Sequence, residues 1–245
     1  MKKFYDLHLR VPLEDFGLAE RIINRASKLG YSGVGVPLPP HTSNETVSKL
    51  QHLCDSVDID FVTRADFVPK SANELLMLLR RFRRKFEVIS VLCLSKAVAR
   101  QAAKDRRVDL ISFPSIDVKK RFFDAAEAEL AANALASFEV DLFSIISASS
   151  FERVRLLSSL RREVALADKF SVPVVFSSGA SGEFSMRTPR DFAAVGLLFD
   201  MPLPRALDAL STNPLTIIKR NRAKLNPKFV APGIRIIQRG KDCEE

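Results

Sequence analysis

Short apolar runs alternate along this chain with longer amphipathic runs, and no other feature restricts the possible folds as strongly. Runs such as 88–92 and 172–176 are largely apolar at successive positions, which is typical of strands buried on both faces. The longer runs carry apolar residues at helical spacing. This alternation predicts βα units that close a parallel sheet. We predict seven strands, at 4–11, 33–38, 60–68, 88–94, 108–113, 138–147 and 172–178.

Helices are predicted between these strands. Capping residues support two of their starts: Ser71 or Asn73 begins one helix, and Thr188 stands before Pro189 at the first helical position of another. The predicted helices cover 18–29, 46–54, 73–86, 95–106, 122–134, 151–170 and 189–199.

The pattern indicates one barrel domain. A further helical run covers 203–225, and 233–237 is either a late strand or a docked tail. A chain of 245 residues with 47% hydrophobic content can bury one large core, and barrels of this size form a single domain. We therefore expect an α/β TIM-like barrel with seven clear strands and an uncertain eighth over residues 1–225, followed by a basic tail over 226–245.

Charge and composition narrow the function classes. The net charge of +9 predicts an anionic partner, most simply nucleic acid. The apolar stretches are only strand-length, so neither a membrane span nor a signal peptide is expected. Three unclustered cysteines without CxxC spacing suggest reduced thiols in a cytoplasmic protein. Neither a GxGxxG motif nor a Walker loop is present, so no nucleotide cofactor is expected.

The first predicted strand begins with Asp6-Leu7-His8, which resembles the first motif of the polymerase and histidinol phosphatase metal-hydrolase barrels. In that motif a second histidine follows two places later, but here Arg10 occupies the position. A guanidinium cannot bind a cation, although it suits a phosphate. The other histidines, His41 and His52, lie in a loop and on a helix, so we predict no protein-bound metal. Asp6 and His8 either cap one end of the barrel interior or are remnant ligands.

Four segments carry a second, more extensive resemblance. They are the opening 6–10, the strand end 174–180 with Ser-Ser-Gly-Ala, the helix entry 186–191 with Met-Arg-Thr-Pro-Arg-Asp, and the turn 211–214 with Ser-Thr-Asn-Pro. Together they resemble ribonuclease P protein component 3, the family of the thirty-kilodalton protein subunit of archaeal and eukaryotic ribonuclease P. The likeness covers nearly the whole chain.

This resemblance implies a barrel that has become an RNA-binding scaffold. It implies assembly with a small ferredoxin-like subunit, with other ribonuclease P protein subunits and with the catalytic RNA that cleaves the 5′ leader from precursor tRNA (EC 3.1.26.5). The chain then supplies no catalytic residue, and Mg²⁺ is held mainly by the RNA. The alternative is a stand-alone metal-dependent phosphoesterase with Asp6 and His8 as ligands, and a third class is a purely structural interaction module.

Basic residues are the candidate RNA contacts. The small residues at 177–180 leave room for a ligand, and Arg187 and Arg190 follow at a helix start that favours phosphate. The segment 219–241 has eight basic residues and no acidic one, which predicts an external anion. The denser run 80–85 is expected to be a solvated helix face. The predicted RNA-binding residues are Arg187, Arg190, Arg162, Arg100, Lys119, Arg64, Arg10, Lys219, Arg220, Arg222 and Lys224.

Overall fold

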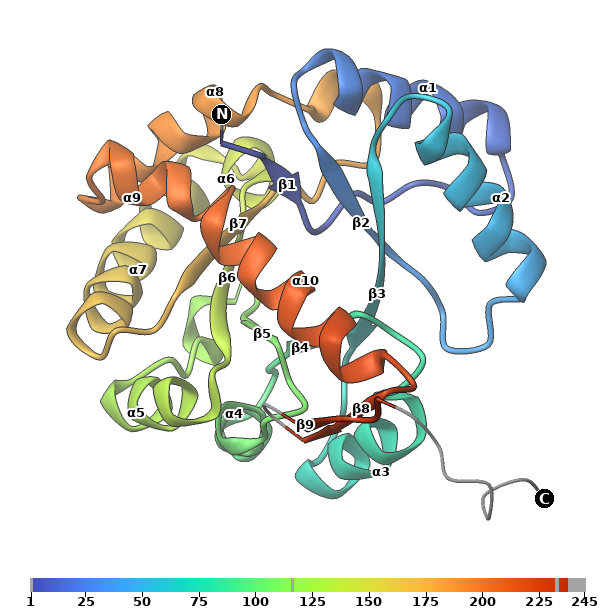
Figure 1. Ribbon diagram of the computed structural model, residues 1–245. Coiled ribbons are helices and arrows are strands. Elements are labelled where there is room, and N and C mark those ends of the chain that lie inside the picture. The colour runs from blue at the N-terminus through green and yellow to red at the C-terminus, as the bar shows by residue number, and fades with distance from the viewer. Residues whose placement is uncertain (1, 116, 232–233, 238–245) are drawn as a thin grey trace.

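Seven parallel strands lie side by side in chain order, with helices around them (Figure 1). The computed structural model describes residues 2–115, 117–231 and 234–237. The strands of this sheet are β1 (Tyr5–Asp6), β2 (Gly33–Pro37), β3 (Asp60–Phe67), β4 (Val88–Leu92), β5 (Leu110–Ser112), β6 (Ser137–Asp141) and β7 (Val174–Ser177). The α-helices are α1 (Phe16–Lys28), α2 (Asn44–Asp55), α3 (Ala72–Phe82), α4 (Lys96–Lys104), α5 (Ala125–Ala134), α6 (Phe143–Ser147), α7 (Ser150–Lys169), α8 (Pro189–Val195), α9 (Leu203–Asp208) and α10 (Thr212–Leu225).

The sheet curves into a nearly closed barrel, and its closure explains why no eighth strand was evident. At one end, Tyr5 N donates to Leu210 O at 2.8 Å and Phe176 N donates to Ala209 O at 3.0 Å. The two-residue segment 209–210 therefore bridges β1 and β7. At the other end the two sides bond directly, because Gly179 N donates to His8 O at 3.0 Å. The predicted TIM-like barrel is confirmed, with a short connection where its eighth strand would stand.

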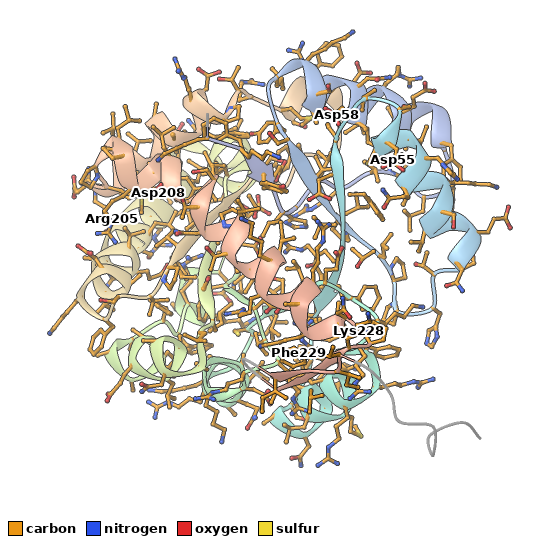
Figure 2. The ribbon with its side chains drawn as sticks, viewed as in Figure 1. Asp55, Asp58, Arg205, Asp208, Lys228 and Phe229 are labelled. Carbon is orange, nitrogen blue, oxygen red and sulfur yellow. The ribbon has the colours of Figure 1, made fainter. Side chains whose placement is uncertain are left out.

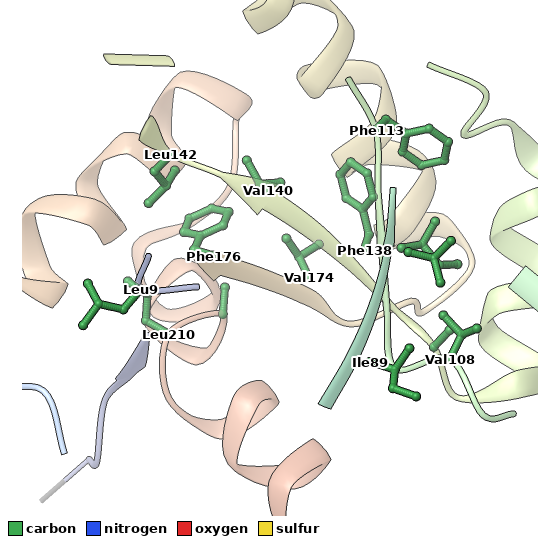
Figure 3. Close-up of a cluster of buried hydrophobic side chains, with 14 of the residues drawn as sticks. Leu9, Ile89, Val108, Phe113, Phe138, Val140, Leu142, Val174, Phe176 and Leu210 are labelled. Carbon is green, nitrogen blue, oxygen red and sulfur yellow. The ribbon is translucent and has the colours of Figure 1, made fainter. Parts of the chain in front are cut away.

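Apolar side chains fill the space between strands and helices. Phe138, Val174 and Phe176 point from β6 and β7 into this core, and Leu210 joins them from the bridging segment (Figure 3). A second apolar cluster lies inside the amino end of the barrel, where Ile217 and Ile218 of α10 pack against side chains of five strands and of Leu7. Helix α10 thus closes the amino end, and Figure 1 shows it crossing that opening.

Polar bonds fasten α10 to the starts of the strands; we call this arrangement the α10 lid. The amide of Asn221 is buried and donates to Asp109 Oδ1 at 2.8 Å, and Arg220 Nη2 donates to the same oxygen at 2.9 Å. Arg222 donates to both carboxylate oxygens of Asp60 at 2.9 Å. Two hollows flank the helix, one lined by residues that include Asp55 and Asp58 and the other by residues that include Arg205 and Asp208 (Figure 2).

Most predicted strands and helices are present in the structure, but several begin or end at other residues than predicted. The predicted strand 138–147 is wrong beyond Asp141, because residues 143–147 form α6. Asp141 Oδ1 accepts from Phe143 N at 3.0 Å and turns the chain into that helix. A short apolar run fits either a strand or a buried helix, so periodicity alone could not decide. Of the predicted strand 4–11, only Tyr5–Asp6 forms β1, although Leu9 N still donates to Gly35 O of β2 at 2.9 Å. The run 203–225 splits into α9 and α10 around the bridging segment.

The helix starts follow the expected chemistry. Ser71 is the N-cap of α3, and its hydroxyl accepts from Glu74 N, so Asn73 is not the cap. Thr188 caps α8 with Pro189 at its first position. The predicted helix 73–86 ends early, at Phe82, and the predicted helix 122–134 begins late, at Ala125.

The end of the described chain forms a small hairpin. Strands β8 (Phe229–Ala231) and β9 (Ile234–Arg235) are antiparallel, so of the two alternatives for 233–237, a late strand or a docked tail, the structure has a strand at Ile234–Arg235. The rest of the predicted basic tail, including Lys241 and Cys243, lies outside the described residues. Cys54 and Cys93 are buried free thiols, and burial raises the pKa of Cys54 to about 12. Among the helices described, none has the length and apolar character that a membrane crossing requires.

Candidate functional site

Six charged or titratable side chains gather at the carboxyl end of the barrel interior, and we call them the mouth cluster. They come in pairs two residues apart, a spacing that in extended chain puts both side chains on the same face. Strand β3 supplies one pair, β6 another, and the segment after β1 the third. The members are His8, Arg10, Arg64, Asp66, Glu139 and Asp141.

A buried ion pair forms the floor of the mouth cluster. Arg64 is only 1% exposed, and its two terminal nitrogens donate to the two carboxylate oxygens of Glu139 at 2.5 and 2.8 Å. The Glu139 carboxylate also accepts from the hydroxyls of Ser90 and Ser177. Burial alone would raise the pKa of Glu139, but the charge and hydrogen bonds of Arg64 outweigh it and hold that pKa below its usual value. The pair is therefore charged and saturated with hydrogen bonds.

The upper layer of the mouth cluster is also paired. Arg10 Nη2 donates to Asp141 Oδ2 at 2.8 Å, and Arg64 Nε donates to Asp66 Oδ1 at 2.6 Å. His8 Nε2 lies 3.2 Å from Asp66 Oδ2. Burial opposes ionisation of Asp66, but Arg64 and His8 hold its pKa well below the usual range. For Asp141 burial dominates and raises the pKa, although His8 and Arg10 oppose the shift.

A cavity of about 290 Å³ opens above this floor, lined by the mouth cluster and by residues that include Leu92, Phe113 and Ser144. Each of its carboxylates already has an arginine or histidine partner, which makes it less available to a cation or a proton. Within residues 2–115, 117–231 and 234–237, no group of three or more His, Cys, Asp and Glu side chains is placed to hold a metal ion. Arg10 is the exposed member of the cluster among its arginines, and its guanidinium is already bonded to Asp141 and to His8 Nε2.

The small residues at 177–180 do not leave room for a ligand, contrary to the sequence prediction. They are buried against the segment that follows β1, where Arg10 N donates to Ala180 O at 2.9 Å. Gly179 has a φ of +63°, and a Cβ there would lie 2.1 Å from Asp141 Oδ1. Glycine is required because this backbone conformation and this close approach leave no space for a side chain.

Arg187 and Arg190 are exposed on the loop and helix that follow β7. Arg187 is held in place, because Tyr31 donates its hydroxyl to Arg187 O at 3.2 Å and Arg187 Nη1 donates to Phe184 O at 2.7 Å. Helix α8 has only seven residues, and its first turn is capped by Thr188 and Asp191. These caps leave the helix start little to offer a phosphate, so the predicted contact here depends mainly on the guanidinium groups.

The remaining predicted RNA-binding residues do not form one surface with Arg187. Arg64 is buried and fully paired, so it cannot reach RNA, and its prediction as an RNA contact is wrong. Arg220 and Arg222 bind Asp109 and Asp60 in the α10 lid, at the opposite end of the barrel. Three further candidates are exposed at other places on the outside of the barrel, on α4, on α7 and before α5: Arg100, Arg162 and Lys119. Lys219 and Lys224 are exposed on α10.

Two structural roles escaped the sequence prediction. Glu139 was missed, although an acidic residue between Phe138 and Val140 in an apolar strand is a signal for a buried ion pair. The run 80–85 was expected to be a solvated helix face, but Arg83 lies beyond the end of α3 and pairs with Asp109 at 3.3 Å.

Comparisons with known proteins give a consistent result. The family model described as RNase P subunit p30 matches residues 3–226. Ribonuclease P protein component 3 of Methanosarcina mazei is 29% identical over 240 residues, which cover 98% of both chains. Ribonuclease P protein component 3 of Methanothermobacter thermautotrophicus is 28% identical over 242 residues, which cover 97% of this chain and 96% of that protein.

Solved structures share the fold. A chain in the cryo-EM structure of archaeal ribonuclease P with mature tRNA superposes with a TM-score of 0.83 at 22% identity, over 97% of this chain and 99% of that one. The crystal structure of A. niger ochratoxinase superposes with a TM-score of 0.58 at 12% identity, over 89% of this chain and 71% of the other. At these identities the likeness is one of fold alone.

Proposed function

Since this chain belongs to the RNase P subunit p30 family and is a protein subunit of ribonuclease P, we propose that it binds RNA of that enzyme through the carboxyl end of its barrel. The observation that carries the proposal is the contrast within this end. The carboxylates of the mouth are neutralised internally, Asp141 in part by Arg10. Arg187 and Arg190, on the loop and helix that follow β7, are instead exposed and pair with no carboxylate among the described residues. Guanidinium groups bind phosphate oxygens through paired hydrogen bonds.

The chain itself supplies no nucleophile or base in this proposal. The particle cleaves the 5′ leader from precursor tRNA, and Mg²⁺ ions held through the RNA supply the chemistry. The protein neutralises phosphate charge and orders the folded RNA by its shape. The partners are the catalytic RNA, precursor tRNA, a small ferredoxin-like subunit and other ribonuclease P proteins, in the cytoplasm. The family assignment and the saturated mouth cluster both weigh against the alternative of a stand-alone phosphoesterase.

Reconstitution tests this proposal. The cognate catalytic RNA and its partner proteins are assembled with and without this chain, and cleavage of precursor tRNA is measured at limiting Mg²⁺. We expect the chain to accelerate cleavage by the RNA and to show no cleavage alone. Cleavage by the protein alone, together with stoichiometric tightly bound zinc or manganese, would instead support the phosphoesterase.

A further inference from the structure

Phe184 is an unusual feature of the face that carries Arg187. The chain has 18 phenylalanines, and only Phe184 and Phe151 are exposed, at 92% and 69%. An exposed ring forgoes the hydrophobic stabilisation that burial provides. The Phe151 ring is partly covered, since the guanidinium carbon of Arg155 lies 4.8 Å from its centroid. Phe184 is therefore the aromatic side chain that stands most openly in solvent.

The loop around Phe184 holds the ring outward. Phe184 is the middle residue of a short 3₁₀ turn, η2 (Glu183–Ser185), which lies against α1. Ser185 Oγ donates to Gly182 O at 2.7 Å, and Arg21 Nε donates to Glu183 Oε1 at 3.2 Å. Met186, two residues on, is buried and anchors the loop. A ring presented on a fixed backbone loses little conformational entropy when a partner stacks on it.

The positively charged side chain of Arg187 is bonded to the same turn. Arg187 Nη1 donates to the backbone carbonyl of Phe184 at 2.7 Å, so the guanidinium is held next to the residue that carries the ring. An aromatic face beside a cation matches an unpaired nucleotide, whose base stacks while its phosphate pairs with the charge. A protein anchor would more often have apolar neighbours, because interface centres are depleted of charged residues. Here the flanking residues are Glu183 and Ser185.

We propose that Phe184 stacks on an unpaired nucleobase of the RNA whose backbone Arg187 contacts. This inference rests on the proposed RNA-binding function and assigns a base-stacking residue to it. Stacking on aromatic side chains tolerates any base, so Phe184 adds affinity without a sequence requirement.

The test compares four full-length proteins: wild type, Phe184→Ala, Phe184→Trp and the matched control Phe151→Ala. Their dissociation constants for the cognate ribonuclease P catalytic RNA are measured from about 0.1 to 0.4 M salt. We expect Phe184→Ala to bind about tenfold more weakly at every salt concentration, because stacking releases no counterions. Phe184→Trp is expected to match wild type, and Phe151→Ala to stay within about twofold. The melting temperature of Phe184→Ala is expected to equal that of wild type, since the ring is 92% exposed.

Equal RNA affinity of Phe184→Ala and wild type would overturn the stacking role while leaving RNA binding intact. If that variant bound RNA normally and instead lost affinity for another protein subunit, the ring would be a protein contact, and the inference would again be wrong. Equal weakening by Ala and Trp would likewise contradict stacking. If wild type showed no RNA affinity, alone or in the assembled particle, the proposed function itself would fail, and the stacking inference with it.

Discussion

The two ends of the barrel use the same chemical pair, arginine with carboxylate, in different ways. At the mouth, Arg64 and Glu139 lie among the strands with side chains only 2% and 1% exposed. In the α10 lid, Arg222 and Asp60 bind at the surface with side chains 40% and 30% exposed. The mouth pair fills the barrel interior, whereas the lid pairs fasten a helix across an opening.

The number of basic residues in a segment therefore does not show whether that segment binds RNA. The one-sign segment 219–241 was expected to need an external anion. For Arg220 and Arg222, internal anions are present instead, because Asp60, Glu87 and Asp109 stand at the starts of strands far away in the sequence. The arginines that remain for a nucleic acid are those without such internal partners, above all on the loop after β7.

The largest effect is expected at the mouth. Arg64→Met is expected to lower the free energy of unfolding by about 3 to 5 kcal/mol, because the buried Glu139 carboxylate would lose its counter-charge. Urea denaturation of the purified protein measures this change. The double variant Arg64→Met with Glu139→Gln is expected to recover part of the loss, since Gln is neutral and can still accept from Ser90 and Ser177. A loss below about 1 kcal/mol for the single variant would show that the mouth is more hydrated than its burial indicates.

A smaller loss is expected in the α10 lid. Arg220→Ala removes one of three side chains that bind the buried Asp109, and Asn221 and Arg83 keep the carboxylate partly compensated. We expect a loss of about 1 to 3 kcal/mol in the free energy of unfolding. Hydrogen exchange provides a local control, because faster exchange is expected in α10 and not in β6. Uniform loss of protection across the barrel would contradict the view of α10 as a separately fastened lid.

The barrel could be predicted because its signal is local. Strands such as Val88–Leu92 are apolar throughout, and caps such as Thr188 mark helix starts within a few residues. The connection in place of an eighth strand could not be predicted, because Ala209 and Leu210 act there through backbone groups, whose hydrogen bonds leave no residue pattern.

The mouth cluster could be predicted only in part. His8 stood out because it belongs to a known motif, and Arg10 because it interrupts that motif, but their partner Asp141 lies more than 130 residues away. Arg64 was assigned to RNA because a basic residue in a strand gives no sign of the acidic side chain opposite it. Glu139 sits across the barrel on β6, and only closure of the sheet brings the two together.

The third prediction compares an exposed arginine of the loop after β7 with an exposed arginine of α9. Arg187→Ala is expected to weaken RNA binding and reconstituted activity about tenfold, or about 1.4 kcal/mol, because a positioned phosphate contact is lost. It is also expected to reduce the salt slope of binding by about 0.7 to 0.9. Arg205→Ala, which removes a 46% exposed side chain near the amino end, is the control and is expected to change affinity less than twofold. A larger loss with Arg205→Ala would place the RNA on the lid side of the barrel.

The smallest expected effect is that of Arg222→Ala on the free energy of unfolding, and its dependence on salt distinguishes the α10 lid from the mouth. Arg222 makes a bidentate contact with Asp60, but the Arg222 side chain is partly solvated. Arg222→Ala is therefore expected to lower the free energy of unfolding by about 0.5 to 1 kcal/mol at 0.1 M salt. At 1 M salt the Debye length falls to about 3 Å, and most of this cost is expected to disappear. The cost of Arg64→Met is expected to stay nearly constant, because no mobile ions reach its buried partner. Urea denaturation of both variants at both salt concentrations makes the comparison. A salt-independent cost for Arg222 would mean that geometry outweighs screening in the lid as well, and the contrast between the two ends would then be one of location alone.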